Sequence, residues 1–373
     1  MAVGLLKLLR APWGALGRGV YEYNVLRHLR TLQPRQLQVN VTYRCNARCA
    51  MCNIWQMPER HEMSVDEMGR VAEDPIFESI ERLTLAGGEP SLRHDLVPLT
   101  EVLLARMPRL RSVTLITNGL AVERILDDTH KLLALCGPLG ISLNVSVSLD
   151  GVGAIHDEMR NVPGAFGKVE RCLVGLQELQ REQRFWFGAS CVITRKNLYH
   201  LVELQDWCAE RNIELSFQLV GFHETYVANV EQRSELDFDQ DDQEHLFRFL
   251  SGLAAGRSPT NVMPYYWNDM LKMYRDGRPR QTPCPFTVDS FVLDVYGDMY
   301  YCLSERRIGN CLDAASDNAR FDGCSAVYYD RGNLAFRAGL WRTACQRCNS
   351  GCFVNVGIKK DLKKHLWYWL TGR

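Results

Sequence analysis

Three cysteines lie close together near the start of the chain, in the stretch VTYRCNARCAMCNI (41–54). Cys45, Cys49 and Cys52 follow a C-x3-C-x2-C spacing. Thiolates bind zinc or iron–sulfur clusters, and both normally take four protein ligands. The nearest histidine, His61, lies outside the loop, so a zinc site here would be incomplete. Three thiolates on an iron–sulfur cluster leave one iron open to an external ligand, as catalytic metal sites do.

The composition indicates a globular metal protein in a reducing compartment. The 373 residues are 46% hydrophobic and 24% charged, and Lys plus Arg and Asp plus Glu each number 44, so charge predicts no nucleic-acid partner. Seven of the 14 cysteines fall within 284–352, which fits metal binding better than a secreted disulfide scaffold. Lys7 and Arg10 interrupt the apolar N-terminus, no clear signal cleavage site follows, and no segment is long enough to span a bilayer. We therefore expect a cytoplasmic protein.

Six β-rich runs alternate with amphipathic helices between residues 36 and 221. The runs are 37–43, 81–87, 112–118, 144–150, 187–194 and 213–221. The helical stretches include 97–107, 168–180, 198–211 and one that opens with a capping box at Ser64 and Glu67. This alternation predicts an α/β fold, a partial (βα)6 TIM-like barrel, whose chemistry lies on the loops that follow the strands.

Polar or glycine-rich motifs follow five of these runs. The first is the cysteine loop, and the others are Gly87-Gly88-Glu89-Pro90, Thr117-Asn118-Gly119, Ser148-Leu149-Asp150-Gly151, and Thr194 with Asn197. Such regular placement on one rim describes an active-site mouth. Individually, Asn118-Gly119 and Asp150-Gly151 are also good turns, and Asn197 is also a good helix cap.

Together, the cysteine loop and the GGEP motif resemble the radical S-adenosylmethionine (radical SAM) superfamily over roughly residues 36–221. The resemblance implies a 4Fe-4S cluster on Cys45, Cys49 and Cys52, whose open iron binds the amino and carboxylate groups of SAM. It implies two tiers of cofactor-binding residues, with Met51 or Asn53 as further candidates for the adenine. The first tier, at the SAM amino group, is Gly87, Gly88, Glu89 and Pro90, and the second is Asn118, Ser148, Asp150, Thr194 and Asn197.

The same resemblance implies a mechanism. An electron donor such as a flavodoxin or ferredoxin would reduce the cluster, and SAM would split into methionine and a 5′-deoxyadenosyl radical. That radical would remove a hydrogen atom from the substrate, while the barrel positions the reactants and excludes water.

A second group of cysteines follows residue 284. Cys284 and Cys302 flank a predicted hairpin that turns at Gly297-Asp298, and the run Cys345-x2-Cys348-x3-Cys352 comes later. This pattern resembles the auxiliary-cluster domain called SPASM, or its shortened form, twitch; a zinc ribbon is the alternative. The full SPASM pattern has C-x2-C-x5-C-x3-C and a further cysteine, whereas no cysteine follows Cys352 here. We therefore expect one auxiliary 4Fe-4S cluster, with ligands among Cys284, Cys302, Cys345, Cys348 and Cys352.

The remaining cysteines have other expected places. Cys311 and Cys324 fit no cluster spacing that we can match. Four others fall within barrel helices or strands and are expected in the core: Cys136, Cys172, Cys191 and Cys208.

The two ends of the chain combine Lys and Arg with leucine or tryptophan, a pattern typical of helices on an anionic membrane surface. The alternative is that they cap the barrel. We expect four parts: a basic amphipathic segment (1–35), the radical SAM partial barrel (36–255), a SPASM/twitch-like Fe-S domain (256–358) and a basic aromatic tail (359–373). Membrane contact at the cytoplasmic face would point to a lipid-linked substrate.

The leading hypothesis is a radical SAM enzyme that oxidises or epimerises a small-molecule, sugar or lipid-linked substrate. The runner-up is modification of a ribosomally made peptide, although the 44 residues before Cys45 lack the strand-rich pattern of a peptide-recognition domain. From another class, the chain could be a non-catalytic Fe-S electron carrier or a zinc-binding scaffold. A carrier needs neither an open iron nor the GGEP loop.

Overall fold

The computed structural model describes residues 12–255, 261–313, 323–351 and 354–361, together with Leu366 and Leu370. They fall into two compact units. One holds residues 34–239 and 290–337, and the other draws on 1–33, 240–289 and 338–373. Cys352, residues 1–11 and most of the tail after 361 lie outside the described residues, so much of the basic pattern predicted at the two ends does too.

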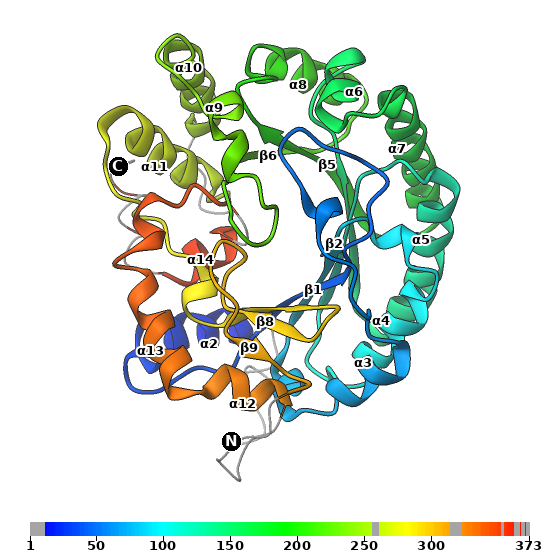
Figure 1. Ribbon diagram of the computed structural model, residues 1–373, viewed down its shortest axis with the longest axis vertical. Helices are drawn as coiled ribbons and strands as arrows, with labels where there is room; N and C mark the ends of the chain where they lie inside the picture. Colours follow the sequence, from blue (N-terminus) through cyan, green and yellow to red (C-terminus); the bar gives the residue numbers. More distant parts are fainter. Residues whose placement is uncertain are drawn as a thin grey trace. The chain divides into compact units, whose positions relative to one another are not determined.

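The larger unit is built on a sheet with the strand order β6-β5-β4-β3-β2-β1-β7-β8-β9. The strands (Figure 1) are β1 Gln36–Thr42, β2 Arg82–Gly87, β3 Ser112–Thr117, β4 Ser142–Ser148, β5 Trp186–Ile193, β6 Leu215–Leu219, β7 Ser290–Asp294, β8 Asp298–Tyr300 and β9 Gly309–Asn310. Strands β1 to β6 are parallel, as the alternation predicts. Among the described strands β6 and β9 stand at opposite ends of this order, so the sheet is an open, partial barrel. The predicted fold class is confirmed.

Helices follow the parallel strands and cover the outer face of the sheet (Figure 1). They are α3 Val65–Val71, α4 Leu96–Leu104, α5 Val122–Cys136, α6 Ala154–Arg160, α7 Ala165–Glu182 and α8 Leu201–Glu210. The predicted capping box is present: Glu67 N–H donates to Ser64 Oγ, and Ser64 N–H donates to Glu67 Oε2. Four cysteines are at most 1% exposed, as expected for core residues: Cys136, Cys172, Cys191 and Cys208.

The hairpin predicted at Gly297 is present, but its strands join the barrel sheet. Strand β7 pairs in parallel with β1 from Gln36 to Asn40, and β8 pairs with β7 in antiparallel fashion. Gly297 turns the chain with φ +83°, a conformation that glycine adopts easily. All five residues of β7 are buried, which suits the continuous run SFVLD of a parallel strand. Residues 290–310 therefore extend the barrel sheet, and the boundaries of the C-terminal Fe-S domain stay a prediction.

The second unit is mainly helical. Its helices are α2 Pro12–Asn24, α10 Gln243–Ala254, α11 Met263–Asp276 and α14 Val354–Lys360. Asn24 Nδ2 donates to Lys360 O over 2.7 Å and ties α2 to α14, while Lys360 Nζ pairs with the buried Asp289. The larger unit also contains the short helices α9 Arg233–Leu236 and α12 Gly323–Tyr329. Helix α13 Arg331–Leu340 begins in the larger unit and ends in the second one.

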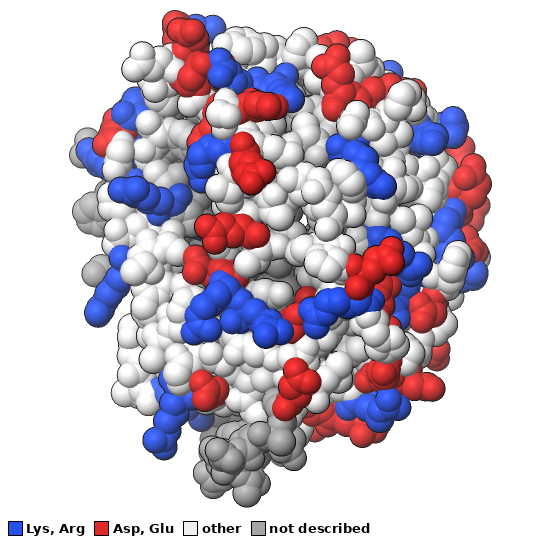
Figure 2. All heavy atoms as spheres, in the orientation of Figure 1, with Lys and Arg blue, Asp and Glu red and all other residues white. Residues whose placement is uncertain are grey.

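No described helix has the length and apolar character that crossing a membrane requires. The face drawn in Figure 2 shows acidic and basic side chains interspersed, in agreement with the equal numbers of the two charges. A large area of one sign, which nucleic acid would favour, is not visible on that face.

A buried histidine supports the end of β4. His156 on α6 is fully buried, and its Nδ1 accepts the backbone N–H of Asp150 over 3.1 Å. Burial lowers the pKa of His156 to about 3, with Arg160 acting in the same direction. The folded protein therefore keeps this ring neutral, whereas the unfolded chain protonates it below its ordinary pKa near 6.5.

Replacing His156 should change how stability depends on pH. Because the folded-state pKa is depressed, the contribution of neutral His156 is complete above about pH 6.5 and is lost as the pH falls towards 3. His156→Asn keeps an acceptor for the Asp150 N–H but does not titrate. Between pH 7.5 and pH 5 the wild type should lose about 2 kcal/mol of unfolding free energy relative to this variant. Urea denaturation followed by circular dichroism measures the difference, and parallel pH profiles would contradict the prediction.

Candidate functional site

The cysteine loop follows β1 and is held by hydrogen bonds on two sides. Arg48 and Ala50 donate their N–H groups to the carbonyls of Arg160 and Met159 at the end of α6. Asn53 donates its N–H to Val227 O, on the segment that follows β6. The loop is therefore fixed by the ends of two other βα units.

Apolar clusters also hold the three cysteines. Cys45 and Cys52 pack against a cluster of Tyr43, Ile54, Val295 and Tyr296. Cys49 packs on the other side, against a cluster of Met51, Met159, Val220 and Leu236. All three thiols are free and partly exposed, so they are positioned by packing and remain accessible.

The protein supplies hydrogen-bond donors to two of these sulfurs. Arg160 Nη1 lies 3.5 Å from Cys49 Sγ, and Asn118 Nδ2 lies 3.9 Å from Cys45 Sγ. Burial raises the pKa of the Cys45 thiol to about 11 and that of Cys52 to about 12. Both are therefore thiols at neutral pH without metal, and binding an iron–sulfur cluster must displace their protons.

The two glycines of GGEP allow an unusually close approach to the chain just before Cys45. Gly88 N–H donates to Thr42 O and Glu89 N–H donates to Arg44 O, each over 2.8 Å. A Cβ on Gly87 would lie 2.3 Å from Thr42 O, and one on Gly88 would lie 2.2 Å from Arg44 O. Gly87 also has φ +126°. Residues with side chains cannot occupy these positions unless the backbone moves.

Glu89 connects the second and third strand ends. Its buried carboxylate accepts four hydrogen bonds, from the N–H and Oγ of Ser91, from Thr117 Oγ1 and from Asn118 N–H. Burial raises the pKa of Glu89, and these four donors oppose that effect by favouring the carboxylate. Glu89 thus fixes the backbone of the GGEP and Thr117-Asn118 loops relative to each other. Pro90 is buried and begins the short helical turn Pro90–Leu92.

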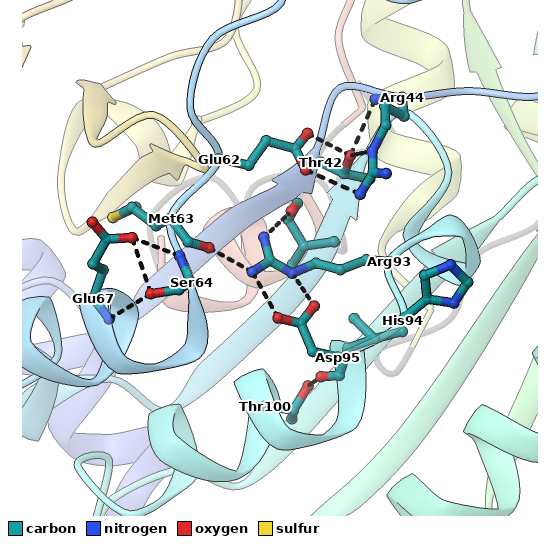
Figure 3. A network of polar contacts seen from close by, with 12 residues as sticks. Thr42, Arg44, Glu62, Met63, Ser64, Glu67, Arg93, His94, Asp95 and Thr100 are labelled. Carbon is teal, nitrogen blue, oxygen red and sulfur yellow. Dashed lines mark hydrogen bonds and ion pairs between the residues drawn. The ribbon is translucent and has the colours of Figure 1, made fainter.

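Arg93 joins the GGEP loop to β1 in the network of Figure 3. Its guanidinium donates to Val41 O and Met63 O and pairs with Asp95 over 2.8 Å. In the same figure Glu62 accepts from Thr42 Oγ1 over 2.6 Å and pairs with Arg44 over 3.3 Å. These contacts anchor the residues immediately before the cysteine loop.

Three residues of the predicted second tier bond mainly to one another. Asp150 is buried, pairs with Arg160 Nη2 over 2.6 Å and accepts the Val192 N–H. Asn197 Oδ1 accepts the N–H and hydroxyl of Thr194, and its Nδ2 donates to the carbonyls of Asp150 and Val192. Asn197 precedes the short helix Leu198–His200 but makes no side-chain cap hydrogen bond to it. Ser148, by contrast, is only partly buried at the end of β4.

The two candidates for adenine contact, Met51 and Asn53, also form hydrogen bonds within the protein. Asn229 Nδ2 donates to Met51 O, and Asn53 Nδ2 donates to Ala228 O. Met51 is 7% exposed. Both residues thus help to hold the segment after β6 against the cysteine loop.

Sequence reasoning did not identify Arg160 or Arg93 as site residues. Arg160 is the last residue of α6 and Arg93 follows a short helical turn, places where an exposed arginine is ordinary. Their burial, at 7% and 3% exposure, depends on contacts with distant segments. The pairing of Asp150 with Arg160, ten residues apart, carries no sequence signature of its own.

The C-terminal cysteines divide between the two units. Cys302 follows β8 in the larger unit, whereas Cys284, Cys345 and Cys348 belong to the second unit; Cys352 is outside the described residues. Within the second unit, Arg280 Nη1 and Ser350 N–H lie 3.5 and 3.4 Å from Cys348 Sγ. Cys311 and Cys324 are both buried in the larger unit. No group of three His, Cys, Asp or Glu that could hold a metal ion occurs within the described part of the chain. A 4Fe-4S cluster binds each thiolate through a different iron, so its ligands need not converge on one point.

Residues 39–223 match the model of the radical SAM superfamily, and the chain belongs to this superfamily. A 4Fe-4S cluster and SAM are therefore its cofactors, and the cysteine loop fits such a cluster by its three accessible thiols and its donors to sulfur. GTP 3',8-cyclase of Pseudomonas savastanoi pv. phaseolicola is 26% identical over 185 residues, which are 48% of this chain and 52% of that protein. Fe-coproporphyrin III synthase of Methanosarcina barkeri is 30% identical over 176 residues, which are 47% and 41% of the two chains. The chain thus spans about half the length of these curated relatives.

Solved structures resemble a larger part of the chain. SuiB of Streptococcus suis bound to S-adenosylmethionine matches with a TM-score of 0.57 at 15% identity, over 87% of this chain and 75% of that one. Native anSMEcpe with bound AdoMet matches with a TM-score of 0.56 at 16% identity, over 91% and 99% of the two chains. At these identities the likeness shows the fold.

Gly88→Ala should disrupt the site. The new methyl group would meet Arg44 O at 2.2 Å, so either the GGEP loop or the strand end before Cys45 must move. We expect a loss of roughly 2 kcal/mol in unfolding free energy, typical of overpacking, and reduced iron binding after anaerobic reconstitution. Gly137→Ala is the matched control, because that glycine is exposed, has an ordinary φ of −55°, and a Cβ built on it would meet nothing within 4 Å. Equal iron content in the two variants would show that the close approach does not matter.

Proposed function

We propose that the chain is an enzyme that cleaves SAM reductively and removes a hydrogen atom from a small-molecule, sugar or lipid-linked substrate, leading to oxidation or epimerisation. The observation that carries the proposal is the pair of backbone hydrogen bonds from Gly88 and Glu89 to Thr42 and Arg44. They place the loop predicted to receive the SAM amino group directly beside the loop that bears Cys45, Cys49 and Cys52. An electron carrier needs no such arrangement.

The residues of the loop have distinct roles in this proposal. Bound to the three cysteines, a 4Fe-4S cluster would supply the electron that cleaves SAM and so begins the radical chemistry. Arg160 and Asn118 would donate hydrogen bonds to the ligand sulfurs of Cys49 and Cys45. The carboxylate of Glu89 is engaged by four donors, so the backbone carbonyls of Gly87 and Gly88 are the better acceptors for the SAM ammonium group.

The second tier is proposed to act in two ways. Asn118 and Ser148 lie at the ends of β3 and β4, where their side chains can meet the methionine or ribose of SAM. Asp150, Thr194 and Asn197 support the site from behind, because they lock the ends of β4 and β5 to each other and place Arg160 beside Cys49. Direct contact of these three residues with SAM stays a prediction.

The C-terminal cysteines are proposed to bind one auxiliary 4Fe-4S cluster. The donors to Cys348 Sγ support this assignment, since ligand sulfurs of such clusters commonly accept hydrogen bonds. The four ligands proposed first are Cys284, Cys302, Cys345 and Cys348, with Cys352 as the alternative to one of them. A flavodoxin or ferredoxin is the proposed electron donor, in the cytoplasm, and contact of the two chain ends with a membrane surface remains part of the lipid-linked alternative.

A peptide substrate is the second candidate. The observation that favours it is the fold likeness to SuiB bound to the precursor peptide SuiA, with a TM-score of 0.55 over 89% of this chain. Native anSMEcpe bound to the Kp18Cys peptide matches with a TM-score of 0.56 over 91% of it. Adding GTP, a lipid extract or a cysteine-containing peptide to the reduced enzyme distinguishes the classes, because the right class should accelerate 5′-deoxyadenosine formation.

The reconstituted protein should release 5′-deoxyadenosine from SAM under dithionite in the absence of oxygen. Replacing Cys45, Cys49 or Cys52 by alanine should abolish release, at least a hundredfold in rate, since each removal takes away one ligand of the cluster that provides the electron. Chromatography with mass detection measures the product.

The control for these variants is Cys136→Ala. Cys136 is 1% exposed at the end of α5, so its replacement tests the loss of a buried cysteine without touching the loop. Release should persist in this variant. A wild-type protein that binds zinc and releases no 5′-deoxyadenosine would instead support the scaffold hypothesis and overturn the proposal.

A further inference from the structure

A buried arginine holds the loop that carries Cys345 and Cys348. Arg280 lies between α11 and Cys284 and is 2% exposed. Its Nη1 donates to Cys348 O over 3.1 Å and to Ser350 O over 2.8 Å, and its backbone N–H donates to Gln346 O over 2.9 Å. Arg280 thus fixes the backbone on both sides of Cys348, through its side chain and its own backbone N–H.

The same guanidinium faces the sulfur. Nη1 lies 3.5 Å from Cys348 Sγ, and Nη2 is buried without a hydrogen-bond partner in the described structure. Thiolates at Cys348 and Cys284, followed by Tyr266 and Asp269, are the groups whose negative charge acts on this cation.

Asp269 attracts Arg280 electrostatically, but within the described residues no carboxylate forms an ion pair with Arg280. Asp269 is the nearby acid, but its oxygens accept from the backbone of Gln281 and Thr282 and from the Thr282 hydroxyl. Nε of Arg280 also goes to Thr282, to its carbonyl and hydroxyl oxygens. A buried cation whose hydrogen bonds go to neutral acceptors is costly unless an anion completes the site.

Arg160, at the cysteine loop of the larger unit, differs in this respect. It also lies 3.5 Å from a cysteine sulfur, that of Cys49, but it forms an ion pair with the buried Asp150 over 2.6 Å. The cation near Cys49 thus has a carboxylate at contact distance, whereas among the described residues the cation near Cys348 has none.

From these contacts we infer that Arg280 is a positioning residue and the cationic partner of an iron–sulfur cluster bound through Cys284 and Cys348, and that it raises the reduction potential of that cluster. The inference rests on the auxiliary cluster of the proposed function. Reduction adds one electron to the cluster and makes it more negative, so a buried cation and an N–H donor to a ligand sulfur both favour the reduced form. A cluster that accepts electrons readily suits oxidation of the substrate rather than epimerisation.

The test isolates the C-terminal cluster in the full-length chain. Replacing Cys45, Cys49 and Cys52 together by alanine removes the first cluster and should leave about four irons per chain. In this background, Arg280→Gln removes the charge and Arg280→Lys keeps it. Redox titration followed by electron paramagnetic resonance gives the midpoint potential of each protein.

We expect Arg280→Gln to shift the midpoint to a more negative value, with a roughly tenfold smaller equilibrium constant for reduction, about 59 mV for one electron. Arg280→Lys should shift it less. The matched control is Arg278→Gln, which removes an exposed charge two residues away, on a side chain that is 67% exposed, and should leave the midpoint unchanged. If Arg280→Gln binds no iron, Arg280→Lys tests the inference instead. Because this variant keeps the positive charge, its midpoint should lie near that of the wild type.

Two results would overturn the inference. One is an unchanged midpoint in Arg280→Gln with full iron content, and the other is the same shift in Arg278→Gln. If the protein with Cys45, Cys49 and Cys52 all replaced by alanine binds no iron, there is no auxiliary cluster and this inference fails. SAM cleavage by the wild type would still support the proposed function. Conversely, the wild type could fail to cleave SAM while Arg280→Gln still shifts the midpoint as expected. That result would overturn the proposed function and leave the role of Arg280 intact.

Discussion

The contact between two stretches of backbone, Gly87–Glu89 and Thr42–Arg44, is the constraint on which the site depends. Strands β1 and β2 are paired in parallel, and this contact continues their association past the strand ends, up to the residue before Cys45. It requires two adjacent residues without side chains, because any Cβ would overlap a carbonyl oxygen of the opposite stretch. The same contact brings the carboxylate of Glu89 within reach of Thr117 and Asn118, and so extends to the third strand end. Much of the mouth of the barrel is thereby ordered through the main chain.

The two buried arginines that lie beside a cysteine sulfur differ in whether a carboxylate forms an ion pair with them. Arg160 and Arg280 lie at the same distance from Cys49 and Cys348, yet Arg160 has Asp150 as its ion-pair partner. A neutral pair next to a cluster donates a hydrogen bond with little net field, whereas an unpaired guanidinium in a low-dielectric setting acts as a full charge. The sequence motif SLDG thus contributes an electrostatic element as well as a turn. Its aspartate determines whether the cation beside Cys49 is compensated.

The strongly periodic features of the sequence predicted much of the fold. Six strands, the capping box at Ser64 and Glu67 and the turn at Gly297 all depend on local chemistry, and each is present. The place of β7 could not be predicted, because its pairing with β1 joins residues 254 positions apart, such as Gln36 and Ser290, and an apolar run does not indicate its partner strand. For the same reason the burial of Arg93, Arg160 and Arg280 was missed: each is neutralised or hydrogen bonded by distant segments, and an arginine in a sequence reads as exposed.

The part of the chain that the family model matches is followed by a segment that also holds the cysteine loop. The family match covers residues 39–223, and the curated relatives, a GTP 3',8-cyclase and an Fe-coproporphyrin III synthase, cover about half of this chain while differing in name. The stretch that the family model matches holds the cysteine loop and GGEP. The segment that contacts the cysteine loop through Val227, Ala228 and Asn229 lies after residue 223, where that match ends. The backbone carbonyls of Val227 and Ala228 and the side chain of Asn229 therefore support the three thiols from outside the matched stretch.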